Sequence, residues 1–157
     1  MLKKNLIDFL VILIVFMLDR LSKLIILNLS ETQEKLDIYV TSYLNFHLIW
    51  NDGIAFGLLS FDDDFNYSLL TLVIVLVSFF VLYLAKRSKK IEKLSYLIVF
   101  GGSLGNIFDR LYYKSVPDFI DFHLNNHHWF IFNVADIFIT IGILLLIAND
   151  LILKKYV

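Results

Sequence analysis

Four long apolar runs constrain this chain more than any other feature. They cover about residues 6–29, 65–85, 94–111 and 130–153. A bilayer core about 30 Å thick requires roughly 20 helical residues, so each run is close to the length of a transmembrane helix. With 59% hydrophobic residues and one proline in 157 residues, the chain is too apolar for an ordinary soluble domain. We therefore predict a single membrane domain, residues 1–157, built on four transmembrane helices.

Basic residues indicate how these helices are oriented. Nine of the fourteen lie before the first run, between the second and third, or after the fourth. Because positively charged short loops stay in the cytoplasm, both termini are expected there, and the longer connections 30–64 and 112–129 are expected outside. The net charge of -1 gives no reason to expect a nucleic-acid partner. The nine residues are Lys3, Lys4, Lys86, Arg87, Lys89, Lys90, Lys93, Lys154 and Lys155.

The first outer connection contains a strand pattern. Residues 39–50 (YVTSYLNFHLIW) are rich in aromatic and β-branched side chains, and the turn residues Asn51, Asp52 and Gly53 follow. We predict short strands here and an interfacial helix over residues 56–61 (FGLLSF).

Charged residues occur inside the apolar runs, where each requires a partner or a function. In the first run, Asp19 and Lys23 share a helix face, and Arg20 is expected to turn away toward the membrane surface. The pair Asp19 and Lys23 either anchors the helix or acts at a site. In the third run, Gly101 and Gly105 predict close approach of another helix.

The third and fourth runs carry further polar groups. Asn106, Asp109 and Arg110 lie one turn beyond Gly105, and an ion pair of Arg110 with Asp109 or Asp19 is a purely structural alternative. In the fourth run, Asn133, Asp136 and Thr140 share a face. Asp136 has no basic partner nearby in its own helix, so we interpret it as a functional residue.

The predicted topology gathers these groups at the outer side of the membrane. They meet there with Asp118, which follows Pro117 in the second outer connection and alone would pass for a solvated loop residue. With no cysteine, and no serine beside a suitable base, nucleophilic acyl transfer lacks its components. His123, His127 and His128 lack the spacing of common zinc sites, so we predict no metal. Two nearby aspartates that share a proton favour aspartic protease chemistry.

The motifs also resemble a known family, lipoprotein signal peptidase (signal peptidase II). They are LDRLSK (18–23), NDGIAFG (51–57), GGSLGNIFDR (101–110), VPDFIDF (116–122) and FNVAD (132–136). The resemblance implies an extracytoplasmic strand cradle beside the four helices, and a bacterial inner-membrane enzyme. It also implies metal-free, cofactor-free cleavage of diacylglyceryl-modified prolipoproteins before the lipidated cysteine. We expect the protein to be a monomer.

The resemblance further implies roles for individual residues. Asp118 and Asp136 are the expected catalytic pair. The expected supporting residues are Asp19, Lys23, Asn51, Gly53, Asn106, Asp109, Arg110, Asn133 and Ala135. A small transporter or proton relay is the alternative, because intramembrane Asp and Arg also mark ion paths. The nearly apolar second run and the apolar inner halves of the other runs disfavour it.

Overall fold

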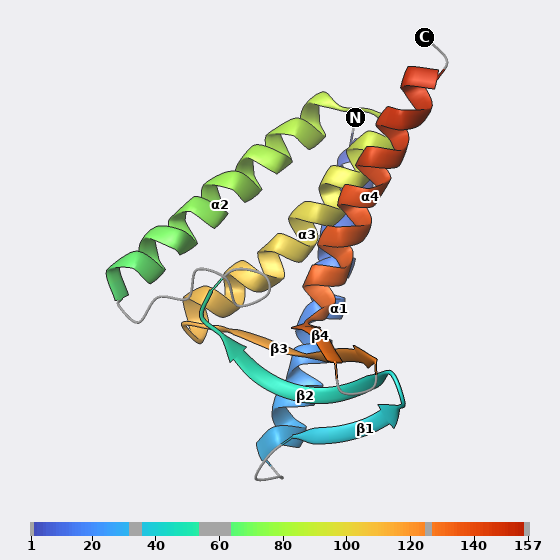
Figure 1. Cartoon of the computed structure of the whole chain (residues 1–157). Helices are drawn as coiled ribbons and strands as arrows, with labels where there is room; N and C mark the ends of the chain where they lie inside the picture. The colour runs from blue at the N-terminus through green and yellow to red at the C-terminus, as the bar shows by residue number, and fades with distance from the viewer. Residues whose placement is uncertain (1, 32–35, 54–63, 125–126, 156–157) are drawn as a thin grey trace.

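The computed structural model describes residues 2–31, 36–53, 64–124 and 127–155. These residues form four helices and a four-stranded antiparallel sheet (Figure 1). The elements are α1 (Leu2–Glu31), β1 (Asp37–Thr41), β2 (Leu44–Asn51), α2 (Asp64–Arg87), α3 (Lys90–Tyr112), β3 (Val116–Leu124), β4 (His127–Phe132) and α4 (Val134–Lys155). The expected interfacial helix over residues 56–61 lies outside the described residues.

Helix α3 packs against each of the other three helices (Figure 1). Glycines permit the closest approaches. A Cβ atom on Gly101 would lie 2.9 Å from the Val15 Cβ, and one on Gly105 would lie 2.9 Å from the Asp19 Cγ. A Cβ on Gly102 would lie 2.7 Å from the Ala135 carbonyl oxygen of α4. Each distance is too short for a side chain, so the close helix approach predicted from Gly101 and Gly105 is confirmed.

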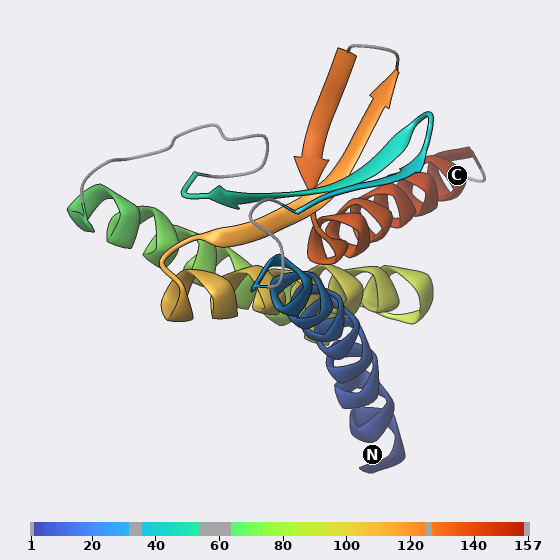
Figure 2. The ribbon, with the colours of Figure 1, turned by 90° about the horizontal axis from the view of Figure 1, so that it is seen from below.

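The sheet lies at one end of the helices and follows chain order, β1-β2-β3-β4 (Figure 2). Its central pair joins segments that α2 and α3 separate in the sequence, with Ile49 opposite Asp118 and Asn51 opposite Val116. The strands predicted over residues 39–50 are therefore confirmed. The other two strands, β3 and β4, lie within residues 116–132, where the sequence pattern had predicted none.

The start of α4 is displaced from the predicted start of the fourth span at residue 130. Phe130 and Phe132 belong to β4, where they pair with Phe122 and Ile120 of β3, and the helix begins only at Val134. The apolar pattern alone predicted that these residues are helical. Their backbone N–H and C=O groups instead form hydrogen bonds with β3. The sheet packs on the C-terminal end of α1 through Ile26, Leu36 and Phe119. The first residues of α4 are thereby fixed against the sheet.

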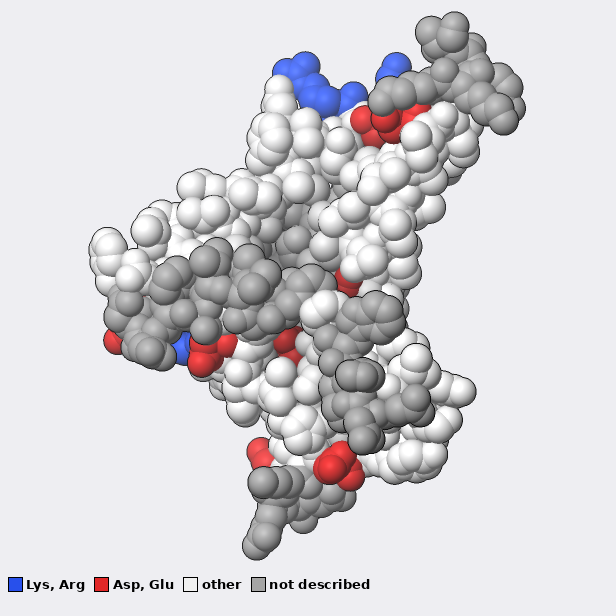
Figure 3. Space-filling view, viewed as in Figure 1, with Lys and Arg blue, Asp and Glu red and all other residues white. Residues whose placement is uncertain are grey.

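The helices present apolar side chains to their surroundings. Among the described residues, α2 and the Val134–Ile152 part of α4 are long and apolar enough to cross a membrane. Phe79 is 56% exposed and Leu144 is 59% exposed. On the face shown in Figure 3, a broad band of mostly uncharged side chains lies between one charged end, where most basic residues of this view gather, and the acidic residues near the sheet. The protein is thus mostly helical, with two candidate spans and a small antiparallel sheet.

Candidate active site

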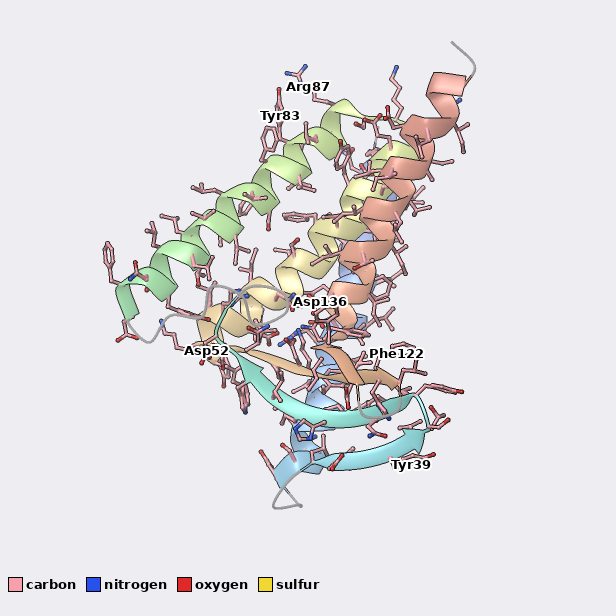
Figure 4. The ribbon with its side chains drawn as sticks, in the orientation of Figure 1. Tyr39, Asp52, Tyr83, Arg87, Phe122 and Asp136 are labelled. Atoms are coloured by element: carbon pink, nitrogen blue, oxygen red, sulfur yellow. The ribbon has the colours of Figure 1, made fainter. Side chains whose placement is uncertain are left out.

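Asp136 lies in the first turn of α4, where the helix meets the sheet (Figure 4). Asn133 precedes the helix and caps it. The Asp136 backbone N–H donates to Asn133 Oδ1 at 3.1 Å, and the Asn133 backbone N–H donates to Asp136 Oδ2 at 3.1 Å. This reciprocal pair is a capping box. The sequence has no basic residue near Asp136 in its own helix, and the structure adds a neutral polar partner, Asn133, just before the helix.

Asn133 also connects Asp136 to Asp118. Its Nδ2 donates to Asp118 Oδ1 at 2.6 Å, while Asn51 Nδ2 donates to Asp118 Oδ2 at 2.8 Å. Both oxygens of Asp118 are therefore held, and the side chain is only 2% exposed. The sheet explains this contact, because pairing of β2 with β3 places the end of β2 beside the start of β3. Asn133 thus holds both carboxyl groups at one position in the fold.

A second shared amide connects Asp136 to buried charges. Asn106 Nδ2 donates to Asp136 Oδ1 at 2.9 Å, and Asn106 Oδ1 accepts from Lys23 Nζ at 2.9 Å. Lys23 is fully buried and also contacts Asp19 at 2.9 Å and Asp109 at 2.6 Å. Lys23 thus joins helix α1 to helix α3 and contacts Asn106, which donates to Asp136.

Arg20 belongs to the same cluster, and its predicted position was wrong. The side chain does not extend to the membrane surface. Instead its guanidinium contacts Asp19 at 2.9 Å and Asp109 at 2.6 Å. Arg20 is 8% exposed and lies over the Phe108 ring. Two acidic and two basic side chains therefore balance in the interior, as the cost of an unpaired buried charge requires.

Arg110 and Ala135 contact the site through the backbone. Arg110 Nη2 donates to the Gly53 carbonyl oxygen at 2.5 Å, and the Ala135 N–H donates to Asp19 Oδ1 at 3.0 Å. The Gly53 N–H in turn donates to Asn51 Oδ1 at 2.9 Å. Among the described residues Arg110 forms no ion pair, in contrast to the structural alternative that paired it with Asp109 or Asp19. Its contact instead positions the turn that carries Asn51.

The surroundings of Asp118 favour its protonated form. Burial raises the pKa of this carboxyl to about 6, and the nearby Asp136 carboxylate adds to the rise. The hydrogen bonds from Asn51 and Asn133, and the charge of Lys23, oppose it. A carboxyl group of this kind is able to hold a proton close to neutral pH, as acid–base chemistry requires.

Asp118 should make the stability of the protein depend on pH. Its pKa is near 3.8 in the unfolded chain and about 6 in the folded protein, so the folded state binds the extra proton between these values. The free energy of unfolding should therefore decline, relative to Asp118→Asn, by about 2–3 kcal/mol from about pH 3 to about pH 7. Chemical unfolding in detergent micelles at several pH values measures this difference. Parallel pH profiles for the two proteins would contradict the raised pKa.

An apolar groove of about 400 Å³ leads to Asp136. Aromatic residues of β4 and the exposed face of α4 line it, and Asp136 is the one ionisable side chain among these lining residues. The groove therefore offers an apolar approach, suited to a hydrocarbon chain or an apolar segment, that ends at a carboxyl group. The lining residues are Phe130, Ile131, Phe132, Asp136, Ile137, Ile139, Thr140 and Ile141.

Two carboxyl groups held together by neutral amides, one of them inclined to keep its proton, are the arrangement of an aspartic peptidase. Comparison with known proteins supports this class. The family model for signal peptidase (SPase) II matches residues 11–152. The chain belongs to this family.

Curated relatives carry the name lipoprotein signal peptidase. The protein of Pelagibacter ubique (strain HTCC1062) is 45% identical over 96% of this chain and 90% of its own length. That of Anaplasma phagocytophilum (strain HZ) is 36% identical, over 95% of this chain and 94% of its own. Two solved structures of bacterial membrane enzymes, both 27% identical, superpose with TM-scores of 0.79 and 0.76. The match to the structure with the TM-score of 0.79 covers 92% of this chain and 87% of the other chain. The match to the second structure covers 92% of both chains.

The structure brings together every residue that the sequence analysis proposed for the site. Sequence reasoning missed Arg20, although its signal was present: an arginine directly beside Asp19, in a run otherwise apolar, needs a buried partner.

Proposed function

We propose that Asp118 and Asp136 jointly activate a water molecule that cuts a diacylglyceryl-modified prolipoprotein before its lipidated cysteine. Membership of the signal peptidase II family assigns lipoprotein signal-peptide cleavage and the aspartic peptidase class to this chain. The residue roles rest on one observation: Asn133 hydrogen-bonds to both carboxyl groups.

The proposed reaction needs one proton on the pair. The ionised carboxylate removes a proton from water as the water oxygen attacks the scissile carbonyl carbon, and the protonated partner donates to the carbonyl oxygen. The tetrahedral intermediate then collapses, and a carboxyl group delivers a proton to the departing amine. One water molecule is consumed, and no metal or other cofactor takes part. The two aspartates titrate as a coupled pair, so acid and base are not assigned singly.

The remaining residues have supporting roles in this proposal. Asn51, Asn106 and Asn133 orient the carboxyl oxygens without adding charge. Lys23, Asp19 and Asp109 hold α1 against α3, and Ala135 fixes α4 to α1 through its N–H. Arg110 holds Gly53 and the turn after β2. The protein thereby fixes the reacting groups before substrate arrives, which reduces the entropic cost of reaction.

We further propose a topology of four spans in the bacterial inner membrane, with both termini in the cytoplasm. The termini and the basic turn between α2 and α3 lie at the same end of the helices, and the sheet lies at the other (Figure 1). α1 and α3 carry charged residues within their length, but Arg20 and Lys23 of α1 pair with Asp109 of α3 in the interior. Arg110 of α3 donates to the Gly53 carbonyl oxygen. The site then faces the outer leaflet, where a diacylglyceryl anchor keeps the substrate, and the groove beside Asp136 suits such an apolar substrate.

The purified protein, assayed in detergent, should cleave a diacylglyceryl-prolipoprotein and release a product that begins with the modified cysteine. The same polypeptide without the lipid should be cut far more slowly, because the anchor positions the scissile bond at the site. Mass spectrometry of the products identifies the cleaved bond. A chelator should leave the rate unchanged, and lost activity that zinc restores would refute the metal-free mechanism. Equal cleavage of the unlipidated chain would refute the substrate class.

A further inference from the structure

A second cavity, separate from the groove beside Asp136, lies between α2 and α3. Its volume is about 230 Å³, well above the ~30 Å³ that one water molecule occupies in the liquid. The cavity therefore has room for a chemical group larger than water. Tyr67, Ser68, Thr71, Leu72 and Val75 of α2 line it, together with Arg110 and Leu111 at the end of α3 and Lys114 just after it.

The lining changes from polar to apolar along α2. Ser68, Leu72 and Val75 follow one another at helical spacing on one face, so the hydroxyl lies near the start of the helix and the hydrocarbon lies deeper. Because α2 and α3 are consecutive and antiparallel, the start of α2 lies beside the end of α3 (Figure 1). The two cations, Arg110 and Lys114, therefore share the polar end of the cavity.

The Arg110 guanidinium has capacity for another ligand. The residue is only 5% exposed, and its Nη2 is engaged by the Gly53 carbonyl oxygen. Its Nε and Nη1 are buried and have no hydrogen-bond partner among the residues that the structure describes. Unsatisfied donors on a buried charge are costly, so a complementary anion with several oxygen acceptors would stabilise this position.

Exposed acidic residues lie at the same end of the molecule. Asp64 opens α2 one turn before Ser68, and Asp52 follows β2 (Figure 4). A free anion would be repelled by these carboxylates. A headgroup that carries an ammonium beside its phosphate would match both signs of charge.

We propose that the cavity binds an aminophospholipid of the outer leaflet, with its phosphate on Arg110 and Lys114 and the start of an acyl chain along Leu72 and Val75. The proposal does not depend on the chemistry at Asp118 and Asp136. The diacylglyceryl group of the proposed substrate contains no phosphate, so the substrate does not supply this ligand. The bound phosphate would also stabilise the Arg110 contact with Gly53.

Native mass spectrometry of the delipidated protein in detergent tests the site with phosphatidylethanolamine as the probe. Ser68→Phe should raise the dissociation constant about tenfold or more, because the ring would occupy the cavity. Lys114→Gln should raise it about twofold to fivefold, as expected for an exposed ion pair. Lys89→Gln, a matched change before the opposite end of α3, should leave it unchanged. Circular dichroism verifies folding of each variant.

Two further probes identify the occupant. Diacylglycerol with the same acyl chains should bind at least about tenfold more weakly than phosphatidylethanolamine, since it lacks the charge-assisted hydrogen bonds to Arg110. Inorganic phosphate should not compete. Equal binding of diacylglycerol, competition by free phosphate, or unchanged lipid affinity in Ser68→Phe would each overturn the proposal. Peptidase activity in lipid-free detergent reports on the catalytic proposal separately.

Discussion

Replacing Asp118 or Asp136 with asparagine is expected to reduce cleavage of a diacylglyceryl-prolipoprotein by about 10²–10⁴-fold. Asparagine keeps the size of the side chain but neither takes a proton from water nor delivers one to the leaving amine. Because the pair acts as a unit, the double variant should be little worse than either single variant. Single-turnover cleavage in detergent, with enzyme in excess of the substrate and above the dissociation constant, measures the chemical step.

A buried aspartate on the same strand provides the matched control. Asp121 of β3 is 2% exposed, as Asp118 is, but it lies three residues further along the strand, so its side chain is on the opposite face of the sheet. There its Oδ2 lies 3.6 Å from His123 Nδ1. Asp121→Asn should therefore keep most of its activity. Thermal unfolding verifies that each variant is folded, which matters most at Asp118, where two amide groups already donate hydrogen bonds. Full activity in a folded Asp118→Asn or Asp136→Asn protein would exclude the pair as catalysts.

The second large effect is expected at Lys23. Lys23→Met keeps the length of the side chain but leaves Asp19 and Asp109 with Arg20 as their remaining cation. Removing one partner from a buried ionic cluster typically costs about 3–5 kcal/mol of stability. The free energy of unfolding in mixed micelles should fall by this amount. The activity should fall as well, because Asn106 loses its contact with Lys23 and is less well oriented toward Asp136.

Lys93 serves as the comparison. It forms an ion pair with Asp8 between α1 and α3, but both side chains are partly exposed, at 13% and 25%. Lys93→Met should cost no more than about 1 kcal/mol. Adding Asp109→Asn to Lys23→Met should recover part of the lost stability, because it removes one uncompensated charge. Equal losses for the two lysine variants, or no recovery in the double variant, would show that burial of the cluster is not what makes Lys23 important.

The sequence determined the features that follow from local pattern. Apolar run length located the four helices, because hydrocarbon thickness sets a minimum helix length. Helical spacing placed Asp19 beside Lys23, and their contact at 2.9 Å bears this out. The small residues Gly101 and Gly105 indicated close helix contact for the same local reason. Motifs spread along the chain gave the family, and Asp118 was recognised through them alone.

Only the tertiary structure decided how distant segments meet. Pairing of β2 with β3 brings Asn51 to Asp118, and pairing of β3 with β4 delays the start of α4 until Val134, which places Asn133 between the two carboxyl groups. Arg20 differs from its predicted position for a related reason. The geometry of a single helix gives only the direction in which a side chain leaves that helix. The partner of a buried charge depends on the neighbouring helix, and here α3 supplies Asp109 to Arg20.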